Sequence, residues 1–232
     1  MHESMDNYLT ATPILDADNP EVVRLARQSV GTARGPVEMA VRLYYVVRDG
    51  IWYDPYVPFY KPEHYRASHT LEVKRGYCVS KAALLCALGR ACGIPSRLGF
   101  ADVRNHLATR QLIERMGTDI FVYHGFTEFF LDGRWVKATP AFNKELCERH
   151  RVPPLEFDGT QDSVFQPYNQ DKRRFMEYVR FHGSFPDVPV ARIVSAWEDA
   201  YGREKVRSWI EAMEKAQGRS LRDFYREDLL ED

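Results

Sequence analysis

The sequence predicts an α+β fold in which helices come first, strands follow and further helices close the chain. Three observations support this order. Helix-start signals occur at Asn19-Pro20 and Gly35-Pro36, an apolar run covers residues 78–92, and the turn sequence Asp132-Gly133 separates two strand-like segments. Segregated helices and strands are typical of α+β proteins, so we expect an antiparallel sheet with helices packed on it.

The composition is that of a globular, soluble protein. Hydrophobic residues make up 44% and aromatic residues 13% of the 232 residues, more than a disordered chain carries. We expect one domain, with N-terminal helices and an aromatic loop (1–69), a central core (70–143), and a C-terminal loop followed by helices (144–232). The formal net charge of -1 gives no positive field, so neither nucleic acid nor a membrane is an expected partner.

The start of the chain and its cysteines favour a cytoplasmic protein. The first ten residues lack the basic start and apolar run of a signal peptide, and no later segment approaches the ~20 apolar residues of a membrane span. The four cysteines have no CxxC spacing, so we expect neither a zinc site nor disulfides. They are Cys78, Cys86, Cys92 and Cys147.

Two helices are expected before residue 50. Asn19 caps the first, over about 20–30, and Pro36 opens the second, in which apolar residues recur at helical spacing to about residue 49. Residues 52–77 contain three prolines among many aromatic residues, a composition that resists a continuous helix or strand. We expect an ordered loop there.

Residues 78–92 predict a helix that is buried on all sides. Its surface is apolar nearly all round, with Lys81 and Arg90 as the charged exceptions. Gly76 before it and Gly93-Ile94-Pro95 after it mark its ends, because glycine tolerates the left-handed cap and proline cannot continue a helix.

Strands are expected next, at 97–103, 120–131 and 134–139. The turn at Asp132-Gly133 joins the last two as a hairpin. In this register Glu128 faces Lys137, a pair worth about 0.2–1 kcal/mol. His124 and Thr139 become diagonal neighbours on the same face of the sheet.

The last third of the chain is expected to be mainly helical. Helices are predicted at 173–180, 190–200 and 204–216, after an irregular segment at 151–169. Strands are thereby confined to the middle of the chain, as the α+β class requires.

Cys78 is the candidate nucleophile. It stands in the first turn of the buried helix, where free N–H groups and the helix dipole favour the thiolate over the thiol. Cys86 and Cys92 lie within or at the end of the same helix, where a cysteine usually behaves as an inert hydrophobic residue. Burial is the commonest fate of a free cysteine, so a structural role for Cys78 is the alternative.

His124 is the candidate base. A neutral imidazole beside a reactive thiol can accept its proton and later protonate a leaving amine, which acyl transfer requires. A lone histidine in a strand is often only a hydrogen-bonded structural residue, and this alternative also stays open. The other histidines show no metal-binding spacing, so no metal is expected.

Together these residues resemble the transglutaminase-like superfamily. Its pattern places a glycine shortly before a cysteine on a helix, then a strand reading His-Ala-Trp-x-Glu, then Trp-x-x-x-Asp-Pro. The resemblance covers about residues 70–143 and rests on stretches in the same order: Gly76-Tyr77-Cys78, Arg90-Ala91-Cys92-Gly93-Ile94-Pro95-Ser96-Arg97, His124-Gly125-Phe126-Thr127-Glu128 and Gly133-Arg134-Trp135. The combination is specific, whereas any single piece is weak.

The resemblance implies a papain-like catalytic core in which the helix bearing Cys78 packs against an antiparallel sheet bearing His124. It also implies a catalytic triad, but this chain has Thr139 where the family usually has aspartate. Threonine can accept a hydrogen bond from the imidazole, yet it brings no negative charge to stabilise an imidazolium.

Two further residues are candidates for orienting the His124 ring. Asn143 shares the strand parity of Thr139, and Asp102 lies on the neighbouring strand. Glu128 is four strand residues away from His124, roughly 13 Å, and is too far to orient the ring.

The expected function is that of a cysteine-dependent amidase, peptidase or acyltransferase, which cleaves a carboxamide or peptide bond through a thioester on Cys78. The backbone N–H of Cys78 is a natural oxyanion donor, and Tyr77 and Tyr53 are candidates for the oxyanion site or cleft. The expected partner is a peptide, protein or small amide substrate, and no cofactor is required. The alternatives are an inactive binding module that retains the fold, and a redox sensor at Cys78.

Overall fold

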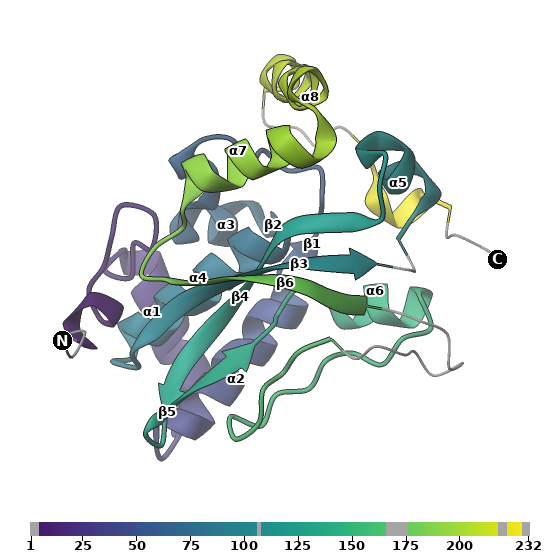
Figure 1. The fold of residues 1–232 in the computed structure, drawn as a ribbon. Coiled ribbons are helices and arrows are strands. Elements are labelled where there is room, and N and C mark those ends of the chain that lie inside the picture. The colour runs from purple at the N-terminus through teal and green to yellow at the C-terminus, as the bar shows by residue number, and fades with distance from the viewer. Residues whose placement is uncertain (1–4, 106–107, 166–175, 218–221, 229–232) are drawn as a thin grey trace.

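A four-stranded antiparallel sheet forms the middle of the computed structural model, which describes residues 5–105, 108–165, 176–217 and 222–228 (Figure 1). The strand order is β5-β4-β3-β6. The strands are β3 (Ser96–Asn105), β4 (Ile120–Leu131), β5 (Arg134–Ala138) and β6 (Met176–Phe185). With the helices that surround this sheet, the fold is of the predicted α+β class.

The β4–β5 hairpin has the predicted register, from Leu131 opposite Arg134 to Thr127 opposite Ala138. Both turn residues adopt the left-handed conformation, with φ of 48° at Asp132 and 83° at Gly133, as a two-residue hairpin turn of the primed type requires. Pairing ends at Ala138, so the chain leaves the sheet just before Thr139.

The predicted pair of Glu128 with Lys137 is wrong at the level of side chains. The two residues are opposed in the hairpin, but the Glu128 carboxylate accepts hydrogen bonds from Arg97 and Ser184, each at 2.6 Å. Lys137 instead forms an ion pair with Asp162 at 3.1 Å. Glu128 is buried on β4, and β3 places Arg97 directly opposite it, so this strand supplies the partner that the hairpin does not.

Strand β6 replaces a predicted helix. A helix was expected over 173–180, of which 173–175 lie outside the described residues, and 176–180 belong to an extended strand on the open edge of β3. The β3–β6 register shifts twice, so the strand has no clean two-residue alternation that would reveal it in the sequence. Residues 176–180 are extended because they pair with β3, which lies far away in the sequence.

The buried helix α4 (Cys78–Ala91) is the centre of the fold, as predicted. One side packs on β3 and β4, where the Thr127 hydroxyl donates to the Ala82 carbonyl at 2.9 Å. The other sides contact α1 (Pro20–Val30), α2 (Pro36–Gly50) and α3 (Ala67–Val73). Lys81 is fully buried because its ammonium group donates to the carbonyls of Arg48 and Ile51 at the end of α2.

The segment predicted as a loop over 52–77 contains short elements. They are β1 (Trp52–Tyr53), the 3₁₀ turn η2 (Pro62–Tyr65), α3 and β2 (Arg75–Gly76). Strands β1 and β2 pair in parallel and lead directly into α4. Elements of two to seven residues are too short to show a period in the sequence, which is why the prediction missed them.

The C-terminal helices α7 (Val190–Tyr201) and α8 (Arg203–Lys215) lie close to their predicted ranges. Helix α7 covers the half of β4 that the shorter β5 leaves unpaired. There the Trp197 indole donates to the Val122 carbonyl at 3.2 Å, and the Val122 N–H donates to the Tyr201 hydroxyl at 2.9 Å. Side chains of α7 thereby form hydrogen bonds with backbone groups of β4 that have no strand partner.

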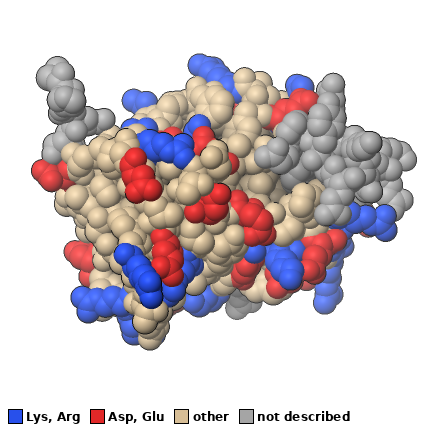
Figure 2. All heavy atoms as spheres, turned by 90° about the horizontal axis from the view of Figure 1, so that it is seen from below, with Lys and Arg blue, Asp and Glu red and all other residues tan. Residues whose placement is uncertain are grey.

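Further short elements escaped prediction: η1 (Met5–Tyr8), α5 (Arg110–Met116), α6 (Lys144–Arg149) and η3 (Phe224–Arg226). Basic and acidic side chains are interspersed over the face drawn in Figure 2. Within the described ranges, no helix combines the length and the apolar character that crossing a bilayer demands.

Candidate active site

Cys78 is the first residue of α4, and three backbone N–H groups lie at its sulfur: those of Gly125, Val79 and Cys78 itself. Burial nevertheless raises the pKa of the Cys78 thiol to about 12, and the three N–H groups offset this only in part. The sequence-based expectation of a favoured thiolate is therefore not met in this closed arrangement. Only 8% of the residue is exposed, so loss of hydration outweighs the helix terminus.

The N-terminus of α4 approaches β4 at Gly125. A Cβ atom on this glycine would lie 3.0 Å from both Val79 Cα and Val79 Cγ2, closer than side-chain carbons normally come. The absent side chain lets the backbone N–H of Gly125 reach Cys78. His124, the preceding residue, is thereby brought to the start of the helix.

His124 is 5% exposed, and its Nε2 has no hydrogen-bond partner among the described residues. Burial lowers the pKa of His124 to about 3. At neutral pH the candidate pair is thus a neutral thiol and a neutral imidazole, and His124 Nε2 makes no hydrogen bond to the thiol in the described structure. An imidazole in this state can act as a base, because it accepts a proton only when the thiol attacks.

Cys78 and His124 line the same cavity, which has a volume of about 60 Å³. Its walls are mainly aromatic and aliphatic, and they come from the aromatic segment, α5, β4, α7 and α8. Among the apolar lining residues are Phe59, Leu112, Met116, Phe121, Trp197 and Trp209. The cavity is therefore suited to an apolar group held against the thiol.

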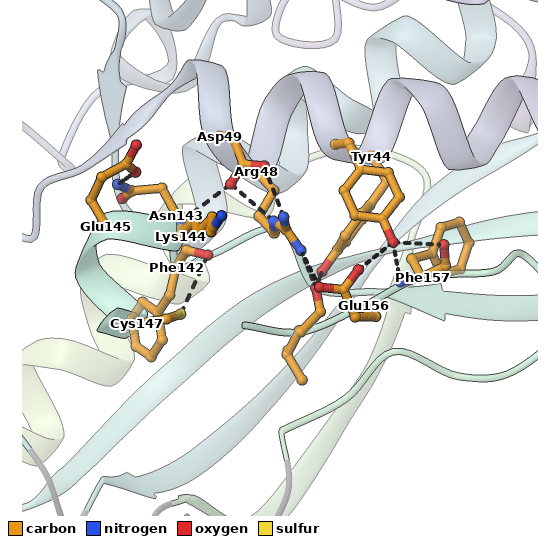
Figure 3. A network of polar contacts seen from close by, with 12 residues as sticks. Tyr44, Arg48, Asp49, Phe142, Asn143, Lys144, Glu145, Cys147, Glu156 and Phe157 are labelled. Carbon is orange, nitrogen blue, oxygen red and sulfur yellow. Dashed lines mark hydrogen bonds and ion pairs between the residues drawn. The ribbon is translucent and has the colours of Figure 1, made fainter. Parts of the chain in front are cut away.

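Thr139 is 1% exposed, and its hydroxyl makes no hydrogen bond within the described part of the chain. Its position is fixed through the backbone, because the Tyr44 hydroxyl lies 3.1 Å from the Thr139 carbonyl and 2.9 Å from that of Leu155. Figure 3 shows Tyr44 in this network together with Arg48, whose guanidinium also donates to Leu155 at 2.7 Å. Helix α2 thus anchors the backbone at Thr139 and at Leu155.

Tyr178 of β6 is a residue that the sequence prediction missed. Its ring centroid lies 6.5 Å from that of His124. Burial raises the pKa of Tyr178 to about 12, an effect opposed by the Phe165 N–H and the Thr139 hydroxyl, which face it. The Tyr178 and Thr139 hydroxyls do not reach hydrogen-bonding geometry with each other. A strand prediction for residues 176–185 would have placed Tyr178 on the sheet, but the helical prediction hid it.

Asn143 and Asp102 are engaged elsewhere. The Asn143 side-chain oxygen accepts from the Tyr53 N–H at 3.2 Å and the Tyr225 hydroxyl at 2.8 Å, and its nitrogen donates to Glu145 at 2.8 Å. Both ends of its amide are therefore committed, the oxygen to β1 and η3 and the nitrogen to α6.

Asp102 acts on the backbone beside the candidate base. Its carboxylate accepts from the Tyr123 N–H at 3.0 Å and lies 2.7 Å from His182 Nε2, while the His182 ring stacks on Tyr123. Tyr123 has a φ of 56°, a conformation that non-glycine residues seldom adopt. Asp102 thus bonds the residue before His124, and within the described residues it makes no hydrogen bond to His124 Nε2.

Tyr53 and Tyr77 both line the cavity, as expected of cleft residues. The Tyr77 hydroxyl, however, donates to the Tyr65 hydroxyl at 2.7 Å, and Tyr65 donates in turn to the Phe59 carbonyl. The Tyr77 hydroxyl proton is thus committed to Tyr65. In the described ranges, no three histidine, cysteine or acidic side chains are grouped so as to hold a metal ion.

A cysteine at the start of a central helix, packed on an antiparallel sheet that carries a histidine, defines the papain-like class of α+β folds. The chain belongs to the transglutaminase-like superfamily, whose family model matches residues 23–140. No curated protein matches the sequence.

Two solved structures resemble the fold. The first, a "putative cysteine protease" from Cytophaga hutchinsonii, has 18% identity and a TM-score of 0.46 over 60% of this chain and 43% of its own. The second, a "putative protease" from Parabacteroides distasonis, has 16% identity and a TM-score of 0.39 over 58% of this chain and 25% of its own. The chain thus spans less than half the length of either.

Proposed function

We propose that this protein is a cysteine-dependent amidase, peptidase or acyltransferase that cleaves a carboxamide or peptide bond through a thioester on Cys78. The observation that carries the proposal is the shared cavity, which is lined by the buried Cys78 at the start of α4, by the buried His124 and by an apolar wall. Membership of the superfamily supports the same class of chemistry.

The neutral pair sets the order of proton transfers. The Cys78 sulfur attacks the substrate carbonyl carbon as its proton passes to His124, and the backbone N–H groups at the start of α4 stabilise the oxyanion. When the C–N bond breaks, the imidazolium returns that proton to the leaving amine. Water or an amine then attacks the thioester, with His124 as the base, and the thiol is restored.

Unmet hydrogen bonding concentrates at this site. Six buried side-chain nitrogen or oxygen atoms in the described residues lack a partner, and four of them belong to Arg115, His124, Thr139 and Tyr178. Buried polar groups are nearly always paired, so this concentration is typical of a site that completes its hydrogen bonds with a ligand. Arg115 and His124 both line the cavity.

The alternative is a binding module that retains the fold without turnover. The raised pKa of Cys78 and the uncharged residue at position 139 favour it, because neither helps to form a thiolate. The two functions differ in whether Cys78 becomes acylated.

An acylation experiment decides between them. The protein is incubated with p-nitrophenyl acetate, and the acetyl adduct is located by peptide mass spectrometry. We expect acetylation at Cys78, slowed about 10²–10⁴-fold in His124→Ala and absent in Cys78→Ala. Cys92→Ala is the matched control, since Cys92 is the more exposed thiol of the same helix region and its loss should leave the rate unchanged. Acetylation that favours Cys92 and ignores His124 would favour the binding module.

A further inference from the structure

The candidate cavity holds one charged side chain among the described residues that line it, Arg115 of α5. Its Nη2 is buried and makes no hydrogen bond within the part of the chain that the structure describes. An arginine remains protonated at neutral pH, while Cys78 and His124 are neutral. Arg115 therefore gives the cavity lining a positive charge, on which the nearby charges of Glu227 and Arg222 act in opposite directions.

Aromatic rings hold the guanidinium in place. Its central carbon lies 4.8 Å from the ring centroid of Trp209 and 5.4 Å from that of Tyr56. The nearby carboxylate of Glu227 is occupied by two hydroxyls, since Tyr56 and Thr109 each donate to it at 2.6 Å. The rings fix the orientation of Arg115 but leave its donor capacity unused, because a ring face accepts no strong hydrogen bond.

We propose that Arg115 binds a carboxylate of the substrate, so that the substrate is a small, mainly apolar compound with one carboxylate in addition to the bond that Cys78 attacks. The inference rests on the proposed function of Cys78. Guanidinium and carboxylate match in charge and planar geometry, and their pairing is strong where water is excluded. The apolar walls accept the remainder of the substrate.

The size of the cavity limits the substrate further. A buried water needs about 10–15 Å³ measured in the same way, so the volume of about 60 Å³ corresponds to roughly four to six waters. A short branched or linear acyl chain fits this space, whereas a folded peptide segment does not.

The test compares an acid with its uncharged isostere. Binding of 4-methylpentanoate and of 4-methylpentanamide is followed by tryptophan fluorescence, since Trp197 and Trp209 line the cavity. We expect the acid to bind about 10–100-fold more tightly than the amide, and Arg115→Met to abolish this preference. The acid should also protect Cys78 from iodoacetamide, which places it in the same cavity.

Two further variants make the outcome decisive. Arg207→Met removes an exposed arginine from α8 and should keep the preference for the acid. Arg115→Lys keeps the positive charge and should retain part of the preference for the acid. It serves as the test if Arg115→Met does not fold. Equal affinities of acid and amide for the native protein, or an undiminished preference in Arg115→Met, would overturn the inference.

The same titration in Cys78→Ala separates the two proposals. Acid binding that depends on Arg115 in this variant, together with no acetylation of native Cys78, supports the carboxylate site and overturns the proposed enzymatic function. Acetylation of Cys78 without any discrimination between acid and amide supports the proposed enzymatic function and overturns the carboxylate site.

Discussion

At the scale of single residues, burial sets the charge state of the candidate pair, and position 139 supplies no charge to oppose it. Thr139 is buried and neutral, and burial alone accounts for the lowered pKa of His124, with no contribution from a charged neighbour. Burial therefore controls both groups, raising the pKa of Cys78 and lowering that of His124. Catalysis from this state requires proton transfer during the attack itself.

Placing at position 139 the carboxylate that the family usually carries should favour the thiolate–imidazolium form of Cys78 and His124. In Thr139→Asp, a negative charge near the imidazole raises the pKa of His124, and the resulting imidazolium lowers that of Cys78. We expect the rate of Cys78 alkylation by iodoacetamide at pH 6–7 to rise at least about tenfold, which corresponds to one pKa unit. Peptide mass spectrometry of alkylation against pH measures it.

Thr139→Val is the matched control, because it removes the unpaired hydroxyl and adds no charge. The pH profile of Cys78 alkylation in Thr139→Val should be the same as in the native protein. A Thr139→Asp protein that is folded by circular dichroism and keeps the native profile would show that position 139 does not reach the imidazole.

Residue types and spacing were sufficient to single out Cys78 and His124, since a cysteine at a helix start and a histidine in a paired strand both leave a local pattern. Tyr178 and Arg115 leave none. Tyr178 reaches the site through pairing of β6 with β3, and Arg115 through a helix of seven residues. Their positions at the cavity and near His124 depend on distant parts of the chain, which no local pattern records.

At the scale of elements, the contact of α4 with β4 at Gly125 brings the two candidate groups together. Gly125→Ala would place a carbon 3.0 Å from the Val79 backbone, which must then move away. We expect a loss of about 1–3 kcal/mol in the free energy of unfolding, measured with urea, and slower acetylation of Cys78.

Gly50→Ala is the control for this element contact. Gly50 ends α2, and a Cβ atom there would meet nothing within 4 Å. Alanine at that position should be neutral or slightly stabilising. A Gly125→Ala protein as stable as Gly50→Ala, with native acetylation, would mean that the close approach does not constrain the site.

Long elements with a clear period were predicted well: α1, α2, α4, α7 and the β4–β5 hairpin. The strand β6 and the short helices were not. The difference is physical, because a helix with one apolar stripe is specified by its own sequence, whereas an edge strand with two register shifts is specified by its partner.

At the scale of the whole molecule, distant segments converge on α4. The Arg90 guanidinium is buried at the far end of this helix and donates to the carbonyls of Thr10, Ser96 and Pro186, joining three regions of the chain. The cavity likewise takes residues from each of the segments 1–69, 70–143 and 144–232. The candidate site therefore depends on the complete fold.

The stability of this fold should fall as the pH is lowered from 6.5 to 5. Burial lowers the pKa of His124 to about 3, against about 6.5 when unfolded, so in this range only the unfolded state binds the proton. One such proton contributes a slope of about 1.4 kcal/mol per pH unit to the free energy of unfolding. His64 acts in the same direction, because burial lowers its pKa to about 4. Urea denaturation at several pH values should therefore give a shallower slope for His124→Gln and an unchanged slope for Cys92→Ala. A slope that steepens in His124→Gln would mean that native His124 is already protonated, as an imidazolium–thiolate pair requires, and an unchanged slope would mean that folding does not shift the pKa of His124.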